Sequence, residues 1–333
     1  MNNQPLLFQS LRVYKTTSGI ETRLESIPVP EIDQGEVLIR VEYSGINYKD
    51  ALAVTGKGLI IRNFPLIAGI DLAGEVVESK DDTFKPGDKV LANGSGLGEV
   101  HDGGLSQYAR IPAEWTIPLP QGLSTREAMI IGTAGFTAAL ALYRMEVNGQ
   151  NPALGPIVVT GASGGVGSFA VNILANQGYE VIAVSGRESQ IARLKMLGAR
   201  QVVSAEALNL SDSPLQKVRF GGVIDNLGGK LLSQLIASTQ LWGNVASIGL
   251  AQSAEFNAAV FPFILRGVSL LGVSSANCPM ILRKALWDRL GDDLKPTHMD
   301  SFVFEEIALD TVVDCSEQLI ARKRHGRTLV SLK

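Results

Sequence analysis

The pattern of hydrophobic and polar positions divides the chain into two regions that predict different kinds of secondary structure. Between residues 10 and 125, short β-branched runs alternate with glycine and proline punctuation. This pattern predicts a compact β-rich barrel with strands near 37–43, 72–79, 85–94 and 106–112. From about residue 124, helix-length apolar stretches separated by short strands take over, which is typical of βαβ units around a parallel sheet.

Six strands can be counted in the second region, the number expected of a complete doubly wound dinucleotide-binding fold. They are predicted at 156–161, 179–186, 201–204, 221–228, 244–250 and 268–275. A last short strand at 328–332 is expected to return to the first domain. The sequence therefore predicts an α/β protein with a β-rich domain over 1–125, completed by about 276–333, and a dinucleotide-binding domain over 126–275.

Composition and charge exclude several classes of function. The chain carries 30 Lys and Arg against 33 Asp and Glu, so no positive field is available to hold a nucleic-acid backbone. Two cysteines and three scattered histidines predict neither a disulfide framework nor a metal site. The longest apolar stretch, 128–143, contains glycines and threonines and predicts a buried helix, and residues 1–15 lack a secretory pattern. We expect a cytoplasmic protein without a membrane partner.

The strongest local motif is the turn GASGGVG at 161–167. Ala162, Gly164 and Gly167 follow the spacing A-x-G-x-x-G between a predicted strand and a predicted helix. Missing side chains let the backbone approach a pyrophosphate, while free N–H groups and the helix dipole attract its charge. An ordinary tight turn is the alternative, and the five further strands at suitable intervals favour the dinucleotide.

The end of the second predicted strand of this region bears on the choice of cofactor. A carboxylate there would accept hydrogen bonds from the adenosine ribose of NAD, but this strand ends in Ser185, Gly186 and Arg187. A hydroxyl and a guanidinium suit a 2′-phosphate, so NADP(H) is predicted. The alternative is a solvated surface arginine.

Residues 160–167 also fit T-G-x-x-x-G-x-G, the phosphate turn of the short-chain dehydrogenases. That family needs a Tyr-x-x-x-Lys pair for proton transfer, and none of the six tyrosines has a lysine four positions later. The turn also lies near the middle of the chain rather than at its beginning. Both observations argue against that family.

A β-rich domain ahead of a dinucleotide fold resembles the medium-chain dehydrogenase/reductase superfamily. Several segments resemble its zinc-independent quinone oxidoreductase branch more specifically, and within that branch the bacterial NADPH-dependent acrylyl-CoA reductases. These segments are 44–58, 60–76, 128–140, 158–168, 184–189, 262–273 and 326–330. The resemblance implies a GroES-like catalytic domain built from both chain ends, a Rossmann domain with a six-stranded parallel sheet, and homodimers. An apolar strand at 268–275 also favours dimers, because its outer edge would be unpaired in a monomer.

Zinc-dependent members of the superfamily bind their catalytic metal through an early cysteine and a Gly-His-Glu segment. The corresponding stretches here read Gly45-Ile46-Asn47-Tyr48 and Gly69-Ile70-Asp71, and a four-cysteine structural lobe is also missing. The resemblance therefore implies an enzyme without zinc. Without a Lewis acid, reduction of an activated C=C bond is more natural than oxidation of an alcohol.

The implied reaction is hydride transfer from NADPH to the β-carbon of acryloyl-CoA, followed by protonation of the α-carbon to give propanoyl-CoA. Charge then develops on the thioester oxygen, where hydrogen-bond donors are needed. The resemblance places Tyr48 beside the cofactor as a positioning or polarising donor, with Asn47 as its helper. In the alternative interpretation Tyr48 packs at a junction, Asp50 complements a helix dipole and Asp71 hydrogen-bonds the junction from inside.

Further cofactor contacts follow from the matching segments. They are Ser163, Gly164, Gly165 and Val166 at the phosphates, Ser185, Gly186 and Arg187 at the adenosine, and in addition Leu250, Ile264, Ser275 and Arg322. Ala205 stands where such proteins often carry an arginine. Two other functions stay open: an NADPH:quinone oxidoreductase, and an NADPH-binding structural or crystallin-like protein with incidental activity.

Overall fold

A computed structural model describes residues 6–333, so the first five residues of the N-terminal stretch interpreted above lie outside the described part. The described chain forms two compact units. The first contains the residues up to 133 together with 276–291 and 302–333, and the second contains 134–275 and 292–301. The predicted boundary at residue 125 lies earlier than this division, because α2 (Thr125–Val147) begins in the first unit.

The segment 292–301 also differs from the prediction, which assigned all of 276–333 to the first domain. Three hydrogen bonds hold it to the second unit. Asn172 Nδ2 donates to Thr297 Oγ1 at 2.9 Å, and Gln177 Nε2 donates to the carbonyl of Asp293 at 2.8 Å. Arg193 Nε donates to the carbonyl of Ser301 at 2.7 Å.

The first unit is β-rich, as the alternating pattern predicts. Its strands are β1 (Leu7–Thr16), β2 (Gly19–Pro28), β3 (Glu36–Ile46), β4 (Leu66–Ile67), β5 (Asp71–Ser79), β6 (Lys89–Asn93), β7 (Tyr108–Pro112), β8 (Ile117–Pro118), β15 (Val303–Ile307) and β16 (Arg327–Ser331), and its helices besides the start of α2 are α1 (Tyr48–Val54), α7 (Met280–Gly291) and α8 (Val312–Ile320). A three-stranded sheet has the order β2-β1-β4. A seven-stranded sheet has the order β15-β16-β3-β5-β6-β8, with β7 also paired to β3.

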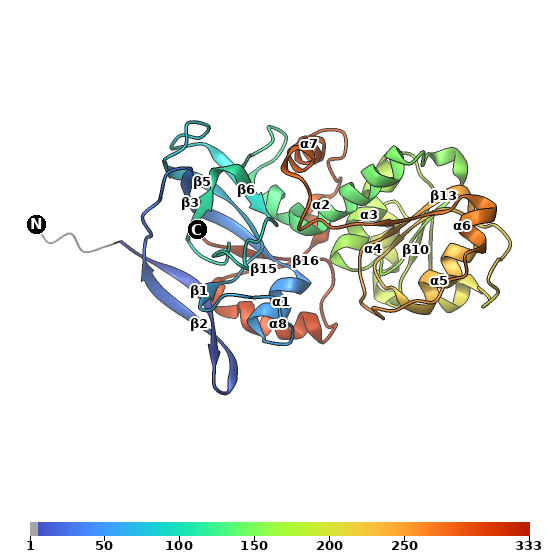
Figure 1. The fold of residues 1–333 in the computed structure, drawn as a ribbon, viewed down its shortest axis with the longest axis horizontal. Helices are drawn as coiled ribbons and strands as arrows, with labels where there is room; N and C mark the ends of the chain where they lie inside the picture. The colour runs from blue at the N-terminus through green and yellow to red at the C-terminus, as the bar shows by residue number, and fades with distance from the viewer. Residues whose placement is uncertain (1–5) are drawn as a thin grey trace, which may run out of the picture. The chain divides into compact units, whose positions relative to one another are not determined.

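Strand β16 brings the C-terminal end of the chain into this domain. It runs antiparallel to β3, with Thr328 opposite Ile46. Along β3, Val37, Ile39 and Val41 point to one face and are buried in the core, because successive strand residues alternate between faces. Helix α1 follows β3 directly and packs against α8 (Figure 1).

The second unit is a doubly wound parallel sheet. Its strands β9 (Ile157–Val159), β10 (Val181–Val184), β11 (Gln201–Val203), β12 (Phe220–Asp225), β13 (Thr239–Ser247) and β14 (Ser269–Gly272) are arranged in the order β11-β10-β9-β12-β13-β14. All six predicted strands are present, although β13 begins earlier than predicted. The helices α3 (Gly165–Asn176), α4 (Ile191–Met196), α5 (Gly229–Ala237) and α6 (Phe261–Arg266) surround the sheet (Figure 1). This is the strand order of a Rossmann fold.

Short 3-10 turns join several of these elements. They are Ala113–Trp115, Pro152–Leu154, Glu188–Gln190, Glu206–Leu208, Met299–Phe302 and Leu309–Thr311.

Helix α2 carries the long apolar stretch of the sequence. By length and composition it could cross a membrane, but 83% of its apolar window is buried inside the protein. The helix is also broken at Gly132, whose φ is 48°. A Cβ added there would lie 2.5 Å from Nη2 of Arg327. Glycine is therefore required both by the positive φ and by the close approach of Arg327. The predicted buried helix is thus two helical segments joined at a glycine.

Candidate active site

The turn between β9 and α3 has the features of a phosphate-binding loop. Gly161 has a φ of 58°, and a Cβ at Gly167 would approach the carbonyl oxygen of Gly161 to 2.4 Å, so this tight turn needs both glycines. The first intrahelical bond of α3 runs from the N–H of Ser168 to the carbonyl of Gly164. The earlier N–H groups, at Gly165 and Val166, therefore face out of the helix end, where a pyrophosphate would fit.

The buried carboxylate of Asp225 accepts hydrogen bonds from residues beside this turn. Thr160 Oγ1 donates to Asp225 Oδ1 at 2.7 Å, and the N–H of Gly228 donates to Asp225 Oδ2 at 2.7 Å. Asn226 Nδ2 donates to the carbonyl of Thr160 at 2.8 Å. Burial raises the pKa of Asp225, while the bonds from Thr160 and Gly228 oppose that shift. The carboxyl ends of β9 and β12 are thereby locked together next to the turn.

The predicted adenosine-binding residues lie just beyond β10. Ser185 Oγ accepts a hydrogen bond from the N–H of Arg187 at 3.2 Å, and both side chains are partly exposed. A Cβ at Gly186 would meet nothing within 4 Å, so the space above this loop is open. The loop follows the strand next to β9, which is where a Rossmann fold receives the adenosine ribose.

The other predicted cofactor residues are spread over both units. Ser163 is buried within the turn, whereas Leu250 and Ile264 are exposed on the second unit at 67% and 71%. Ser275 is the last residue before the chain returns to the first unit. Arg322 follows α8 in the first unit, with a φ of 58°. Their joint contact with a cofactor stays a prediction.

In the first unit, Asn47 and Asp50 fix the start of α1. The N–H of Asn47 donates to Asp50 Oδ2 at 2.8 Å, and Asn47 Nδ2 donates to the same oxygen at 3.0 Å. The other oxygen of Asp50 accepts from the N–H of Ile70 at 2.9 Å. Asp50 therefore does more than complement the helix dipole, because it also joins α1 to the segment leading into β5.

Asp71 and Arg327 complete a buried polar cluster around Asn47. Asn47 Nδ2 donates to Asp71 Oδ2 at 2.7 Å, and Arg327 Nη1 donates to Asn47 Oδ1 at 2.7 Å. Arg327 Nη2 lies 3.4 Å from Asp71 Oδ2, and both side chains are almost fully buried. The N–H of Thr133, freed by the break in α2, donates to Asp71 Oδ2 at 2.9 Å. We call Asn47, Asp50, Asp71 and Arg327 the buried cluster.

Burial changes the acidity of the cluster. Desolvation and the neighbouring Asp71 carboxylate raise the pKa of Asp50 to about 7, although the hydrogen bonds from Asn47 and Ile70 oppose this. Desolvation lowers the pKa of Arg327, and the charges of Asp71 and Asp50 oppose that shift. Buried charges need such partners, because an uncompensated charge in the interior costs several kcal/mol.

Sequence reasoning missed one member of this cluster, Arg327. It names Asn47 as a site residue and offers structural roles for Asp50 and Asp71 at this junction, but it gives Arg327 no role although the matching segment 326–330 contains it. The available signal was an arginine in an otherwise apolar terminal strand, because a buried arginine needs a partner. Tyr48, the first residue of α1, follows Asn47 directly and is 56% exposed, so its ring can reach a ligand.

The residues at the positions of the superfamily's catalytic zinc do not form a zinc site. Asn47 and Ile70 supply no soft or imidazole ligand, and the carboxylate of Asp71 already faces the guanidinium of Arg327. A divalent ion beside a buried guanidinium would meet direct repulsion. Within residues 6–333, no group of three His, Cys, Asp or Glu side chains is arranged to hold a metal.

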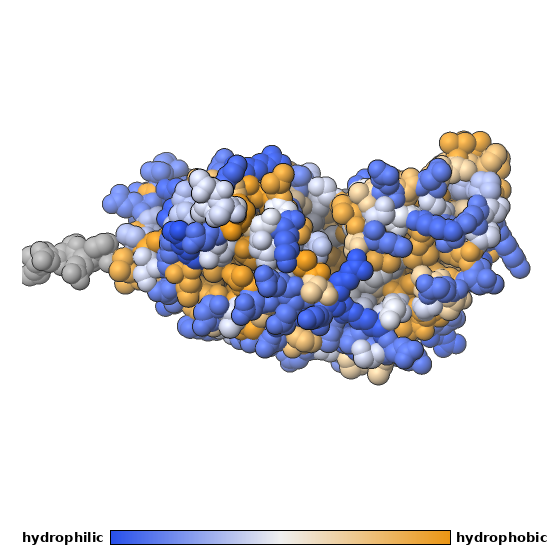
Figure 2. Space-filling model, turned by 90° about the horizontal axis from the view of Figure 1, so that it is seen from below, coloured by the Kyte–Doolittle hydropathy of each residue, from blue (hydrophilic) through white to orange (hydrophobic). Residues whose placement is uncertain are grey.

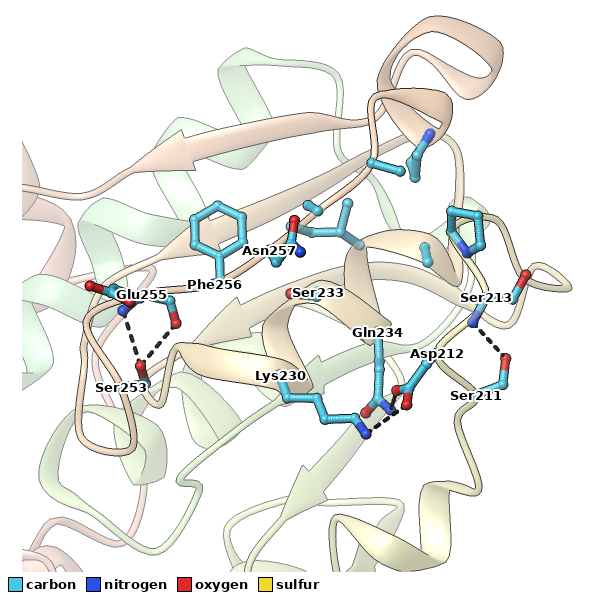
Figure 3. Close-up of a pocket in the computed structure, with 16 residues that line it drawn as sticks. Ser211, Asp212, Ser213, Lys230, Ser233, Gln234, Ser253, Glu255, Phe256 and Asn257 are labelled. Atoms are coloured by element: carbon cyan, nitrogen blue, oxygen red, sulfur yellow. Dashed lines mark hydrogen bonds and ion pairs between the residues drawn. The ribbon is translucent and has the colours of Figure 1, made fainter.

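A cavity of about 750 Å³ lies elsewhere in the second unit, along α5 and the loops before β12 and α6. Figure 3 shows Lys230 and Gln234 pointing toward Asp212 on one side of α5, with Phe256 and Asn257 on the other. Lys230 Nζ and Gln234 Nε2 both bond to this carboxylate, at 2.7 and 2.8 Å. None of the predicted cofactor residues lines the cavity, so it is separate from the dinucleotide turn.

A β-rich unit and a Rossmann unit in one chain define a class of two-domain nicotinamide-dependent oxidoreductases. Comparison with known families agrees: residues 33–121 match the alcohol dehydrogenase GroES-like domain, and residues 165–290 match the zinc-binding dehydrogenase family. Together with the full-length relatives described next, these matches show that the chain belongs to the medium-chain dehydrogenase/reductase superfamily.

Several relatives are similar over nearly the whole chain. Bacillus subtilis YhfP, which is named as a quinone oxidoreductase, is 45% identical over 98% of this chain and 99% of its own. The acrylyl-CoA reductase AcuI of Ruegeria pomeroyi is 40% identical over 98% of this chain and 99% of its own. The crystal structure of YhfP with NAD bound has a TM-score of 0.95 to this fold and covers 98% of this chain and 99% of that one.

The yhdH oxidoreductase of Salmonella enterica, solved in complex with NADP, has a TM-score of 0.92 at 44% identity. It covers 98% of this chain and 100% of that one.

Proposed function

We propose that this protein reduces the C=C bond of acryloyl-CoA to propanoyl-CoA with NADPH. The observation that carries the proposal is the buried cluster, which includes the residue before Tyr48 and occupies positions that the resemblance matches to the metal ligands of zinc-dependent members. An active site without a Lewis acid suits an acceptor that is already activated, such as an α,β-unsaturated thioester. The 40% identity to an acrylyl-CoA reductase over 98% of the chain supports the same substrate class.

NADPH, when bound, supplies the hydride, which adds to the β-carbon of the thioester. This chain must then orient the enoyl group and offer a donor to the thioester oxygen, where negative charge develops. Tyr48 is an exposed residue, and its hydroxyl is the donor we assign to that task. A proton taken up from solvent adds to the α-carbon and completes the reduction to propanoyl-CoA.

In this proposal Asn47 does not act on the substrate directly, in contrast to the helper role that the resemblance implies. Its two amide N–H hydrogens are engaged by Asp50 and Asp71, and its oxygen accepts from Arg327. The amide therefore has no hydrogen left to donate to a substrate in this arrangement. We assign Asn47 as a positioning residue that fixes the first turn of α1 and thereby Tyr48.

NADPH is proposed over NADH on the basis of Ser185 and Arg187, which follow β10 where a carboxylate would favour NAD. The Salmonella relative solved with NADP supports this choice. YhfP was solved with NAD bound, so titration of this protein with both NADPH and NADH is the experiment that tests the choice.

Quinone reduction is the second candidate, favoured by the 45% identity to YhfP. Steady-state oxidation of NADPH with acryloyl-CoA, crotonyl-CoA and a benzoquinone, measured in parallel, separates the two. We expect kcat/KM for acryloyl-CoA to exceed that for the quinone by at least about tenfold, or 1.4 kcal/mol of transition-state stabilisation. Equal or greater efficiency with the quinone would reverse the assignment.

A homodimer in the cytoplasm completes the proposal. Among residues 6–333, strand β14 ends the order of its sheet and pairs only with β13, which leaves its outer edge open to a symmetry mate. Exposed apolar side chains near this end of the sheet include Trp242 and Leu265, and apolar surface gathers where the second unit carries α6 (Figure 2). A single monomeric species in sedimentation at micromolar concentration would argue against it.

A further inference from the structure

Asn93, the last residue of β6, lies beside the buried cluster but is not part of it. It is the cross-strand partner of Asp71 in the pairing of β5 with β6, and it is only 2% exposed. Its side-chain oxygen accepts two hydrogen bonds, from Arg283 Nη1 at 3.1 Å and from Trp287 Nε1 at 3.0 Å. Both donors lie on α7 and are fully buried.

Arg283 connects Asn93 to one of the places where the chain passes between the two units. The chain enters the first unit at Ala276, whose carbonyl accepts from Arg283 Nη2 at 3.0 Å and from the N–H of Ser95 at 3.0 Å. Arg283 Nη2 also reaches the carbonyl of Cys278 at 3.4 Å. One guanidinium therefore binds both Asn93 and the crossing at residue 276.

The amide nitrogen of Asn93 faces a second crossing. The chain leaves the first unit after Thr133, and Asn93 Nδ2 lies 3.5 Å from Thr133 Oγ1. The same hydroxyl donates to Asp71 Oδ1 at 2.5 Å, while the N–H of Thr133 donates to Asp71 Oδ2. Because a hydroxyl has one hydrogen, accepting from Asn93 leaves that hydrogen directed at Asp71.

We propose that Asn93 is a positioning residue that joins the two chain crossings, at Thr133 and at Ala276, to the carboxylate of Asp71. Its oxygen holds the crossing at Ala276 through Arg283, and its N–H₂ group sets the direction of the Thr133 hydroxyl. The orientation of Asp71, and through it that of Asn47, then depends on both crossings at once. The contact between Asn93 and Thr133 is the longest of the series, so it is the one to test.

Thr133→Val removes the hydroxyl at nearly constant volume, and Thr133→Ser is the matched control that keeps it. Hydrogen exchange of the full-length protein, without cofactor or acceptor, is followed in peptides covering 93–97, 129–136 and 274–283. The N–H of Ser95 reports the crossing at Ala276 directly, because its acceptor is that residue's carbonyl. Thr133→Val should raise its exchange rate about two- to tenfold, as expected for the loss of one buried hydrogen bond, whereas Thr133→Ser should not.

An increase confined to 129–136 would overturn the proposal, since it would show that Thr133 does not communicate with Ala276. Asn93→Asp is an independent variant in case Thr133→Val unfolds. It keeps an oxygen for Arg283 and Trp287 but replaces the N–H₂ group that faces Thr133. We expect faster exchange in both crossing segments, and unchanged exchange at 129–136 would likewise overturn the proposal.

The catalytic consequence rests on the proposed function and is measured separately. With whichever acceptor the wild type reduces, Thr133→Val should lower kcat about threefold or more, with KM for NADPH nearly unchanged, and Thr133→Ser should restore it. If the wild type reduces no acceptor, the proposed function fails, and the exchange experiment still decides the role of Asn93.

Discussion

Arg327 donates a hydrogen bond of 2.7 Å to the side-chain oxygen of Asn47, although 280 positions separate the two residues in the sequence. The contact forms because β16 pairs antiparallel with the end of β3, which places Arg327 beside the residue that precedes α1. The same guanidinium reaches the carbonyls of Met129 and Ile130, the last turn before the break in α2. One C-terminal side chain thus joins the start of α1 to the first segment of α2.

Replacing Arg327 by Met should destabilise the first unit strongly. The change leaves Asp71 buried without its guanidinium, and breaking a buried ion pair typically costs about 3–5 kcal/mol. Urea unfolding followed by tryptophan fluorescence measures the loss, with Arg327→Lys as the control that keeps the charge but fewer donors. A loss below about 1 kcal/mol for Arg327→Met would show that the cluster does not depend on this pair.

Asp50 should make stability depend on pH. Its pKa is raised to about 7 in the folded protein, from 3.8 in the unfolded chain. Between these values the folded state binds more protons than the unfolded state, so the free energy of unfolding falls as pH rises through this window. From pH 5 to pH 8 the fall due to Asp50 should be about 2–3 kcal/mol.

Asp50→Asn cannot titrate, so the difference between its pH profile and that of the wild type isolates this contribution. The variant should also lose stability at every pH, because its N–H₂ group would face the donors at Asn47 or Ile70. Urea unfolding at both pH values provides the measurement. Parallel profiles for the two proteins would contradict the raised pKa.

Tyr48 should contribute to catalysis through its hydroxyl. If that group stabilises the developing enolate, Tyr48→Phe lowers kcat about tenfold or more and leaves NADPH affinity nearly unchanged. Single-turnover hydride transfer and NADPH titration of Tyr48→Phe and Tyr48→Ala test this. A Phe variant with normal kcat, together with an Ala variant that binds NADPH poorly, would indicate that the ring packs against the nicotinamide and that the hydroxyl has no catalytic role.

Arg187 should determine cofactor preference. Arg187→Ala removes a charge-assisted bond to the 2′-phosphate, which costs about 1.5–3 kcal/mol and raises the Kd for NADPH roughly 10–100-fold. The Kd for NADH should not change, because NADH lacks that phosphate. Titration of both cofactors against both proteins gives the answer, and a wild type that uses NADH equally well would refute the role of Ser185 and Arg187.

Zinc should be unnecessary for activity. The resemblance matches Asn47, Ile70 and Asp71 to the metal-binding segments of zinc-dependent members, and here Arg327 lies against the carboxylate of Asp71. We expect less than about 0.1 zinc per purified chain and no effect of chelators on turnover. Stoichiometric zinc with chelator-sensitive activity would require another ligand set.

The Rossmann half of the molecule could be predicted almost completely from the sequence. Its strands are short apolar runs with helices between them, and the turn from Gly161 to Gly167 lies within seven residues, so every signal is local. The boundary between the two units is harder to predict from the sequence. α2 reads as one apolar helix, and only the contacts of Gly132 with Arg327 and Asp71 reveal why it breaks there.

The sequence by itself determined the fold class and the dinucleotide turn, because periodicity and glycine spacing act over a few neighbouring residues. The family followed from the resemblance of longer segments along the chain. Tertiary structure alone decided what surrounds Asn47. Asp71 and Arg327 are 256 positions apart, and no local pattern indicates that they meet. Each would be costly to bury alone, so their roles depend on a long-range strand pairing that brings opposite charges together in the interior.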